Sequence, residues 1–136
     1  MKKILMSLMA VAVMALAAGL TSCNEQVESQ IFDLTFDGEA VQQGDRMNYQ
    51  VNYEPIFVEE IGKVAALAAP DARTFMVTTT ENKAKTEVQK AFDTAAEKAQ
   101  AKAGNPSSLK GLKVILKYST VKTAPNPAEF ATYTFK

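Results

Sequence analysis

The chain has 136 residues and a formal net charge of zero, with 15 basic and 15 acidic residues, one cysteine, no histidine and no tryptophan. The absence of histidine excludes Ser-His-Asp and Cys-His catalytic pairs as well as imidazole metal ligands. A single cysteine excludes an internal disulfide and a cysteine zinc cluster. Balanced charge gives no general attraction to nucleic acid, so no nucleic-acid partner is expected. We predict no cofactor, no metal site and no catalytic residue.

The first residues have the layout of a secretory signal peptide. Lys2 and Lys3 form a basic start, an apolar run extends from Ile4 to Leu20, and small residues precede Cys23. The run is shorter than the about 20 residues that a transmembrane helix needs. No Lys/Arg cluster follows it as a stop-transfer flank. We therefore expect cleavage of this segment and not a membrane span.

The end of this segment, Leu20-Thr21-Ser22-Cys23, resembles the bacterial lipobox, in which an aliphatic, a small polar and a small residue precede an obligatory cysteine. In bacterial lipoproteins this cysteine becomes the mature N-terminus and carries a diacylglycerol on sulfur and an amide-linked acyl chain such as palmitate. The resemblance implies that residues 1–22 are the signal peptide and that Cys23 is the lipid attachment site. Two or more acyl chains anchor a protein stably, so the membrane is the expected partner. The alternative is a secreted or membrane-anchored protein whose cysteine is incidental.

The residue after the cysteine bears on location. In the lipoproteins that this segment resembles, an Asp there often retains the protein in the inner membrane, so Asn24 implies the outer membrane of the cell envelope, on its periplasmic or surface face. Residues 23–30 are predicted to form the lipidated N-terminus and a short linker. The linker, residues 24–30, reaches at most about 25 Å. Residues 31–136 are predicted to form a single domain, which the linker holds close to the membrane.

The domain is predicted to begin with a hairpin. Apolar residues alternate with polar ones in two runs, which are Phe32, Leu34 and Phe36, and then Met47, Tyr49, Val51 and Tyr53. Such alternation is typical of half-buried strands, and the segment 38–45 between them has turn composition. Phe and Tyr side chains would meet across this hairpin. Pro55 then suits the first turn of a helix that extends to Ala69, although a strand start also fits residues 56–58.

Thr74–Thr80 is rich in β-branched residues and predicts a strand. The clearest helix follows, with Thr78 and Glu81 matching a capping box and Gly104 ending it. Its apolar stripe is Ala84, Val88, Ala91, Phe92, Ala95, Ala96, Ala99 and Ala103. Glu81 and Lys85 are expected to pair on its exposed face.

Two further strands, residues 112–118 and 130–135, are predicted to end the chain. Ala131, Tyr133 and Phe135 share one face of the second. The order strand, strand, helix, strand, helix, strand, strand predicts an α+β fold. We expect a small two-layer domain, with a mostly antiparallel sheet and one or two helices on one face.

The carboxylates do not form a convincing site. Asp33 and Asp37 lie about 13 Å apart on one strand, beyond either glycosidase separation, so a solvated strand face is predicted. Asp37, Glu39 and Asp45 surround a turn, but their spacing does not match an EF-hand calcium loop. The adjacent Glu59-Glu60 would point to different sides of a helix and so would not share a proton.

The chain has four tyrosines that could form a binding platform, which are Tyr49, Tyr53, Tyr118 and Tyr133. They alternate in phase with apolar residues, which favours core positions with the hydroxyl groups reaching an edge. Lys113 and Lys117 flank Ile115 and predict a sheet edge or solvated face. Ile115 then means either that this face is partly covered by a second layer or that it carries a small exposed apolar spot.

These features lead to three hypotheses. The first is a non-enzymatic, lipid-anchored envelope protein that acts as an interaction or binding subunit, with an envelope protein or a glycan as partner. The second is a small-ligand or glycan-binding module, which requires at least two of the four tyrosines in a solvent-facing cleft. The third is a carboxylate-dependent hydrolase, which requires two acids brought together from different strands.

Overall fold

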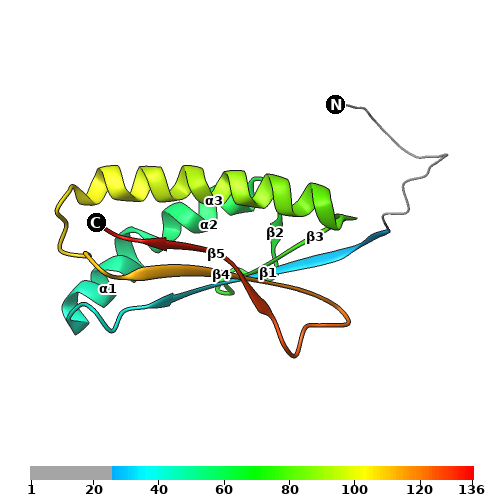
Figure 1. Ribbon diagram of the computed structural model, residues 1–136, viewed down its shortest axis with the longest axis horizontal. Helices are drawn as coiled ribbons and strands as arrows, with labels where there is room; N and C mark the ends of the chain where they lie inside the picture. The colour runs from blue at the N-terminus through cyan, green and yellow to red at the C-terminus, as the bar shows by residue number, and fades with distance from the viewer. Residues whose placement is uncertain (1–25) are drawn as a thin grey trace.

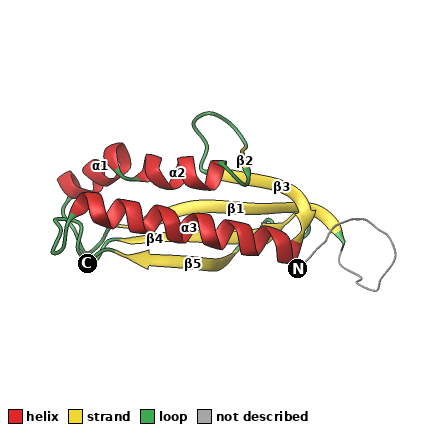
Figure 2. Ribbon diagram, turned by 90° about the horizontal axis from the view of Figure 1, so that it is seen from above, coloured by secondary structure: helices red, strands yellow, loops and turns green. Residues whose placement is uncertain are grey.

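The computed structural model describes residues 26–136, so the predictions for the signal peptide and Cys23 lie outside the described residues. The elements are β1 (Val27–Asp37), α1 (Gln43–Asn52), α2 (Glu54–Gly62), β2 (Ala66–Leu67), β3 (Thr74–Thr80), α3 (Glu81–Ala103), β4 (Lys113–Thr120) and β5 (Ala128–Thr134). The strands form one antiparallel sheet in the order β2-β3-β1-β4-β5. The long helix α3 and α2 lie across one face of this sheet, with α1 at one end (Figures 1 and 2). The predicted two-layer α+β fold is confirmed.

The central strand β1 contributes side chains to the centre of the hydrophobic core. Phe32 lies opposite Phe75 of β3 on one side and Tyr118 of β4 on the other. Phe32 and Leu34 are buried beneath the helices, as their alternation with polar residues predicted. β1 begins at Val27, before the predicted domain boundary at residue 31. Residues 27–30 therefore belong to the sheet and not to a linker.

The predicted second strand and its hairpin were wrong, because residues 47–52 belong to helix α1. Tyr49 and Tyr53 are four residues apart, as are Met47 and Val51, so the same alternation also satisfies helical spacing. Tyr49 and Tyr53 are buried, whereas Met47 and Val51 are 57% and 69% exposed. β3 and β4 already flank β1, which leaves no place beside it for another strand. A Phe and a Tyr do contact each other here, between a strand and a helix and not across a hairpin. The rings of Phe36 on β1 and Tyr49 on α1 have centroids 4.9 Å apart.

The helix predicted from Pro55 is present as α2, with the proline in its first turn. It ends at Gly62, well before the predicted Ala69. The difference arises because Ala66 and Leu67 form β2, which pairs with Met76 and Phe75 of β3. The strand predicted over Thr74–Thr80 is confirmed as β3.

The long helix is confirmed as α3, but its predicted N-cap was wrong. Thr80 caps the helix by accepting a hydrogen bond from the Lys83 N–H at 3.3 Å, whereas Thr78 lies within β3. The predicted alanine stripe is buried except for Ala103, which is half-buried. Its one large anchor, Phe92, packs on Phe57 of α2 with ring centroids 5.4 Å apart. The small alanine side chains let α3 approach its neighbours closely, so the two helices form a tight second layer over the sheet.

The last two strands form the predicted C-terminal hairpin, with bounds shifted by one or two residues. β5 lies at the edge of the sheet beside β4. Ala131 and Phe135 are buried and Tyr133 is half-buried, so these three residues share the inner face as predicted. This register brings the end of β5 beside the last turns of α3.

Candidate functional site

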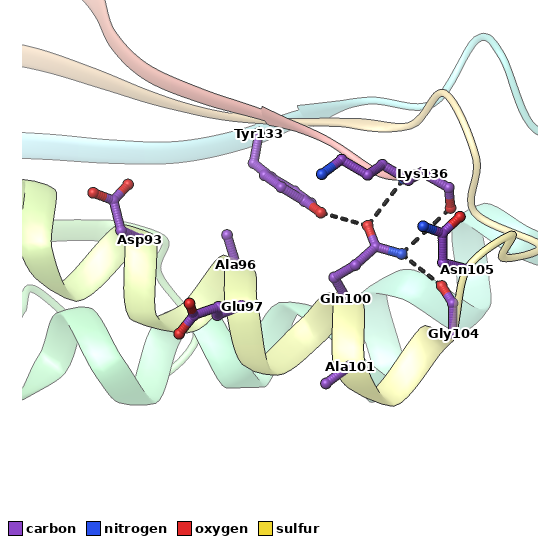
Figure 3. A pocket seen from close by; sticks show the side chains of 9 residues that line it. All are labelled: Asp93, Ala96, Glu97, Gln100, Ala101, Gly104, Asn105, Tyr133 and Lys136. Carbon is purple, nitrogen blue, oxygen red and sulfur yellow. Dashed lines mark hydrogen bonds between the residues drawn. The ribbon is translucent and has the colours of Figure 1, made fainter.

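A hollow lies between the C-terminal half of α3 and the end of β5, and we call it the α3/β5 groove. It is open to solvent and has a cavity volume of about 510 Å³. Its lining residues are Asp93, Ala96, Glu97, Gln100, Ala101, Gly104, Asn105, Tyr133 and Lys136. Figure 3 shows that they come from one helix, the turn after it and the C-terminal strand.

Gln100 joins the two walls of the groove. Its Oε1 accepts hydrogen bonds from the Tyr133 hydroxyl and from the Lys136 backbone N–H, the latter at 2.9 Å. Its Nε2 donates to the backbone oxygens of Gly104 at 2.6 Å and of Lys136 at 3.3 Å (Figure 3). All the polar atoms of this amide are therefore used in holding the end of the chain against α3.

The charged groups of the groove come from both of its walls. Asp93 and Glu97 lie one turn apart on α3, and Asp93 accepts a hydrogen bond from Gln89 at 2.9 Å. Glu97 forms no ion pair within residues 26–136. Lys136 lies on the opposite wall (Figure 3). The two carboxylates against one ammonium group give the groove an acidic side.

The Tyr133 hydroxyl in the groove is not activated as a nucleophile. Partial burial raises the pKa of the Tyr133 hydroxyl above its usual value of 10.0. This hydroxyl donates its proton to the Gln100 amide oxygen, which is not a base at neutral pH. Nucleophilic catalysis needs a base beside the nucleophile, and Tyr133 has none within hydrogen-bonding distance among the described residues.

A second, smaller hollow lies where β1 and α3 begin. It is lined by Gln26, Glu28, Glu81, Asn82 and Lys85. Lys85 pairs with Glu81 at 2.7 Å, as predicted, and its Nζ lies 4.4 Å from the centre of the Tyr118 ring. These two contacts already engage the cation of this hollow within the domain.

The aspartates named above as possible site residues each take part in local structure. Asp33 accepts a hydrogen bond from the Thr74 hydroxyl at 2.5 Å, across to β3. Asp37 accepts one from the Glu39 N–H at 3.0 Å, which is turn chemistry. Asp45 lies in the first turn of α1. Within residues 26–136 no three acidic or cysteine side chains gather closely enough to hold a metal ion.

The tyrosines divide into two pairs. Tyr49 and Tyr53 are buried, as expected for core residues, although Tyr49 lies on α1 and Tyr53 at the turn between α1 and α2 and not on a strand. Burial and the nearby Glu54 carboxylate raise the pKa of Tyr49 above its usual 10.0. Tyr118 and Tyr133 are half-buried on the inner face of the sheet. Only Tyr133 lines the α3/β5 groove, so the four rings do not form one platform.

On the other face of the sheet, Lys113 is exposed while Ile115 and Lys117 are half-exposed. Of the two alternatives, this distribution favours a solvated face with one apolar spot.

Sequence reasoning separated Glu59 from Glu60 correctly but missed what Glu60 does. Glu60 is buried, and it accepts hydrogen bonds from Lys98 of α3 at 2.7 Å and from Lys63 at 3.1 Å. These bonds lower the pKa of Glu60 below its usual 4.5. The role of Gln100 was also missed, because a glutamine on a polar helix face carries no distinguishing pattern.

Comparison with known proteins finds no relatives of this chain. No protein family matches it, and neither curated proteins nor solved structures give a match. Among residues 26–136 there is no helix with the length and apolar character needed to cross a membrane.

Proposed function

We propose that this chain is a lipid-anchored protein of the cell envelope, and that it acts as a non-enzymatic binding subunit held close to its membrane. The observation that carries the proposal is the segment Leu20-Thr21-Ser22-Cys23 after a basic start and an apolar run. An acylated Cys23 would anchor the domain without any apolar patch on the folded part, since two or more acyl chains suffice. Asn24 after the cysteine favours the outer membrane.

The fold supports a short tether. β1 begins at Val27, so the chain between Cys23 and the sheet is shorter than the linker expected from sequence. A partner must therefore come to the membrane surface.

The α3/β5 groove is the proposed binding surface. Small-molecule sites are mostly enclosed and apolar, with few polar groups. The groove is open and presents Asp93, Glu97 and Lys136, which favours a polypeptide partner with basic side chains. Gln100 and Tyr133 bond to each other and shape the floor.

A glycan-binding module is the second candidate, favoured by the Tyr133 ring in the groove. It has less support, because Tyr49 and Tyr53 are buried and the Tyr118 ring is covered by Lys85. A carboxylate-dependent hydrolase would have to use Asp93 and Glu97, which come from one helix and not from facing strands.

The anchor is tested by the mass of the N-terminal peptide of protein purified from membranes. We expect a chain that begins at Cys23 and carries the mass of its acyl groups. The variant Cys23→Ser should leave the membrane fraction. An unmodified Cys23, or a retained Met1, would refute the proposal. Asn24→Asp tests location, with a shift toward the inner membrane expected in density fractionation.

The groove is tested by placing a photo-crosslinking amino acid at Glu97 in the full-length protein in cells. Glu87 is the matched control, since it is an exposed glutamate on the same helix that does not line the groove. We expect one envelope protein to crosslink from position 97 and not from position 87. Charge reversal in Glu97→Lys should remove a crosslink made from position 101 of the groove. Equal crosslinking from both positions would refute the groove, and capture of glycan alone would favour the second candidate.

A further inference from the structure

Two exposed apolar side chains lie toward the end of the domain where β1 begins. Val27 is 66% exposed and Val121 is 67% exposed, and these are two of five large apolar side chains exposed in the described part of the chain. Val27 is the first residue of β1, and Val121 directly follows β4.

The sheet register places both valines at the same end of the molecule. Gln30 of β1 lies opposite Thr120, the last residue of β4, and Val27 lies opposite Thr80, just before α3. The loop 121–127 and the start of α3 thus lie toward the same end of the sheet as the beginning of β1. In Figure 1 all three lie in the half of the molecule opposite α1 and the C-terminus, and the loop projects from the sheet on the side away from α3.

The loop at this end has a composition that suits a lipid surface. The loop 121–127 has the sequence Val-Lys-Thr-Ala-Pro-Asn-Pro, whose only charged side chain is that of Lys122. A cation beside small apolar groups matches the boundary between phosphates and acyl chains in a bilayer. Two acids lie nearby in the small hollow: Glu81, whose charge is paired with Lys85 at 2.7 Å, and Glu28 of β1.

The tether brings this end to the membrane. This step rests on the proposed acylation of Cys23. From Cys23 to Val27 the chain spans at most about 14 Å, at 3.3–3.6 Å per residue. A tether this short gives the end of the domain a high effective concentration at the bilayer surface.

We propose that Val27 and the loop 121–127 form a lipid-contacting end, which rests on the bilayer and points the α3/β5 groove away from it. The two valines offer too little apolar area to hold the domain without acyl chains, so the contact depends on the anchor. α3, of 23 residues, is about 34 Å long. The groove is lined by its second half, from Asp93 onward, and so stands clear of the headgroups.

The chain contains no tryptophan, which allows a single introduced reporter. Full-length, lipidated Val121→Trp protein would be reconstituted into phosphatidylethanolamine–phosphatidylglycerol vesicles, with or without brominated acyl chains. Val51→Trp is the matched control, since Val51 is 69% exposed on α1 at the opposite end. We expect the fluorescence of Trp at 121 to be quenched at least threefold more strongly by brominated lipid than that of Trp at 51.

Val27→Trp is a second reporter at the same end and should also be quenched. The control is protein that floats with the vesicles and carries the acylated N-terminal mass. If quenching at positions 121 and 27 of this protein does not exceed quenching at position 51, the lipid-contacting end is overturned and the anchor is left intact. An unmodified N-terminal peptide from the same sample would overturn the anchor and this inference together.

Discussion

Removal of the Gln100 side chain should loosen the end of the chain from α3. Gln100→Ala deletes four hydrogen bonds, two accepted by Oε1 from Tyr133 and Lys136 and two donated by Nε2 to Gly104 and Lys136. Hydrogen bonds contribute about 0.5–1.5 kcal/mol each to stability. Because this side chain is half-exposed, its partners regain bonds to water, and the lower bound applies. The expected loss of unfolding free energy is about 2 kcal/mol.

The assay is urea denaturation of the purified variants, read as a shift in midpoint at constant slope. Gln89→Ala is the control, since Gln89 lies on the same helix and, within residues 26–136, its side chain bonds only to Asp93, at 2.9 Å. Such a pair on one helix contributes about 0.2–0.5 kcal/mol. A Gln100→Ala protein that is destabilised no more than Gln89→Ala would refute the reasoning.

A second measurement distinguishes release of the chain end from α3 from a general loss of stability. Partial burial raises the pKa of Tyr133, so hydration of its hydroxyl in Gln100→Ala should lower that pKa toward 10.0. Ultraviolet titration of the tyrosinate should show this change in Gln100→Ala and not in Gln89→Ala.

Three other perturbations follow from the packing. Gly111 has φ of +94, and an added Cβ would lie 2.8 Å from the Ala40 Cβ. Gly111→Ala should therefore cost about 2–6 kcal/mol in urea denaturation, from backbone strain and overpacking, and Ala40→Gly should recover about 1–3 kcal/mol of it; no recovery would contradict the contact. Phe92→Ala should cost about 3–5 kcal/mol by the same assay, and a value below 1 kcal/mol would show that Phe92 is not the anchor of α3. Glu60→Gln tests the lowered pKa of Glu60. A carboxyl group whose pKa is lower in the folded than in the unfolded protein stabilises the folded state at pH values above its unfolded pKa. This stabilisation is lost as the pH falls through the folded pKa. The stability gap between wild type and Glu60→Gln should thus be full above a pH of about 4.5 and close below it, and a gap that does not change with pH would refute the Lys98 pairing.

Local periodicity was sufficient for much of the fold. The alanine stripe around Phe92 and the β-branched run Thr74–Thr80 predicted α3 and β3 without tertiary information. The segment 47–53 was not decidable in this way. Its alternation satisfies both a strand and the i, i+4 spacing of Tyr49 and Tyr53 on a helix. The neighbours of β1 in the sheet decided in favour of the helix.

The candidate site was beyond sequence reasoning for a different reason. Gln100 and Tyr133 are 33 residues apart, and Glu60 and Lys98 are 38 apart. No local pattern links residues at such separations, because their contacts exist only once the sheet register and the packing of α3 are set.

The sequence by itself determined the α+β class, the long helix and most strands, since these depend on residue spacing within a few turns or pleats. It also carries the lipobox-like segment ending at Cys23, on which the proposed anchor rests. Only the tertiary structure decided the helical state of α1, the early start of β1 and the α3/β5 groove. Each of these depends on which distant segments lie side by side, and that choice is made by the packing of the whole core.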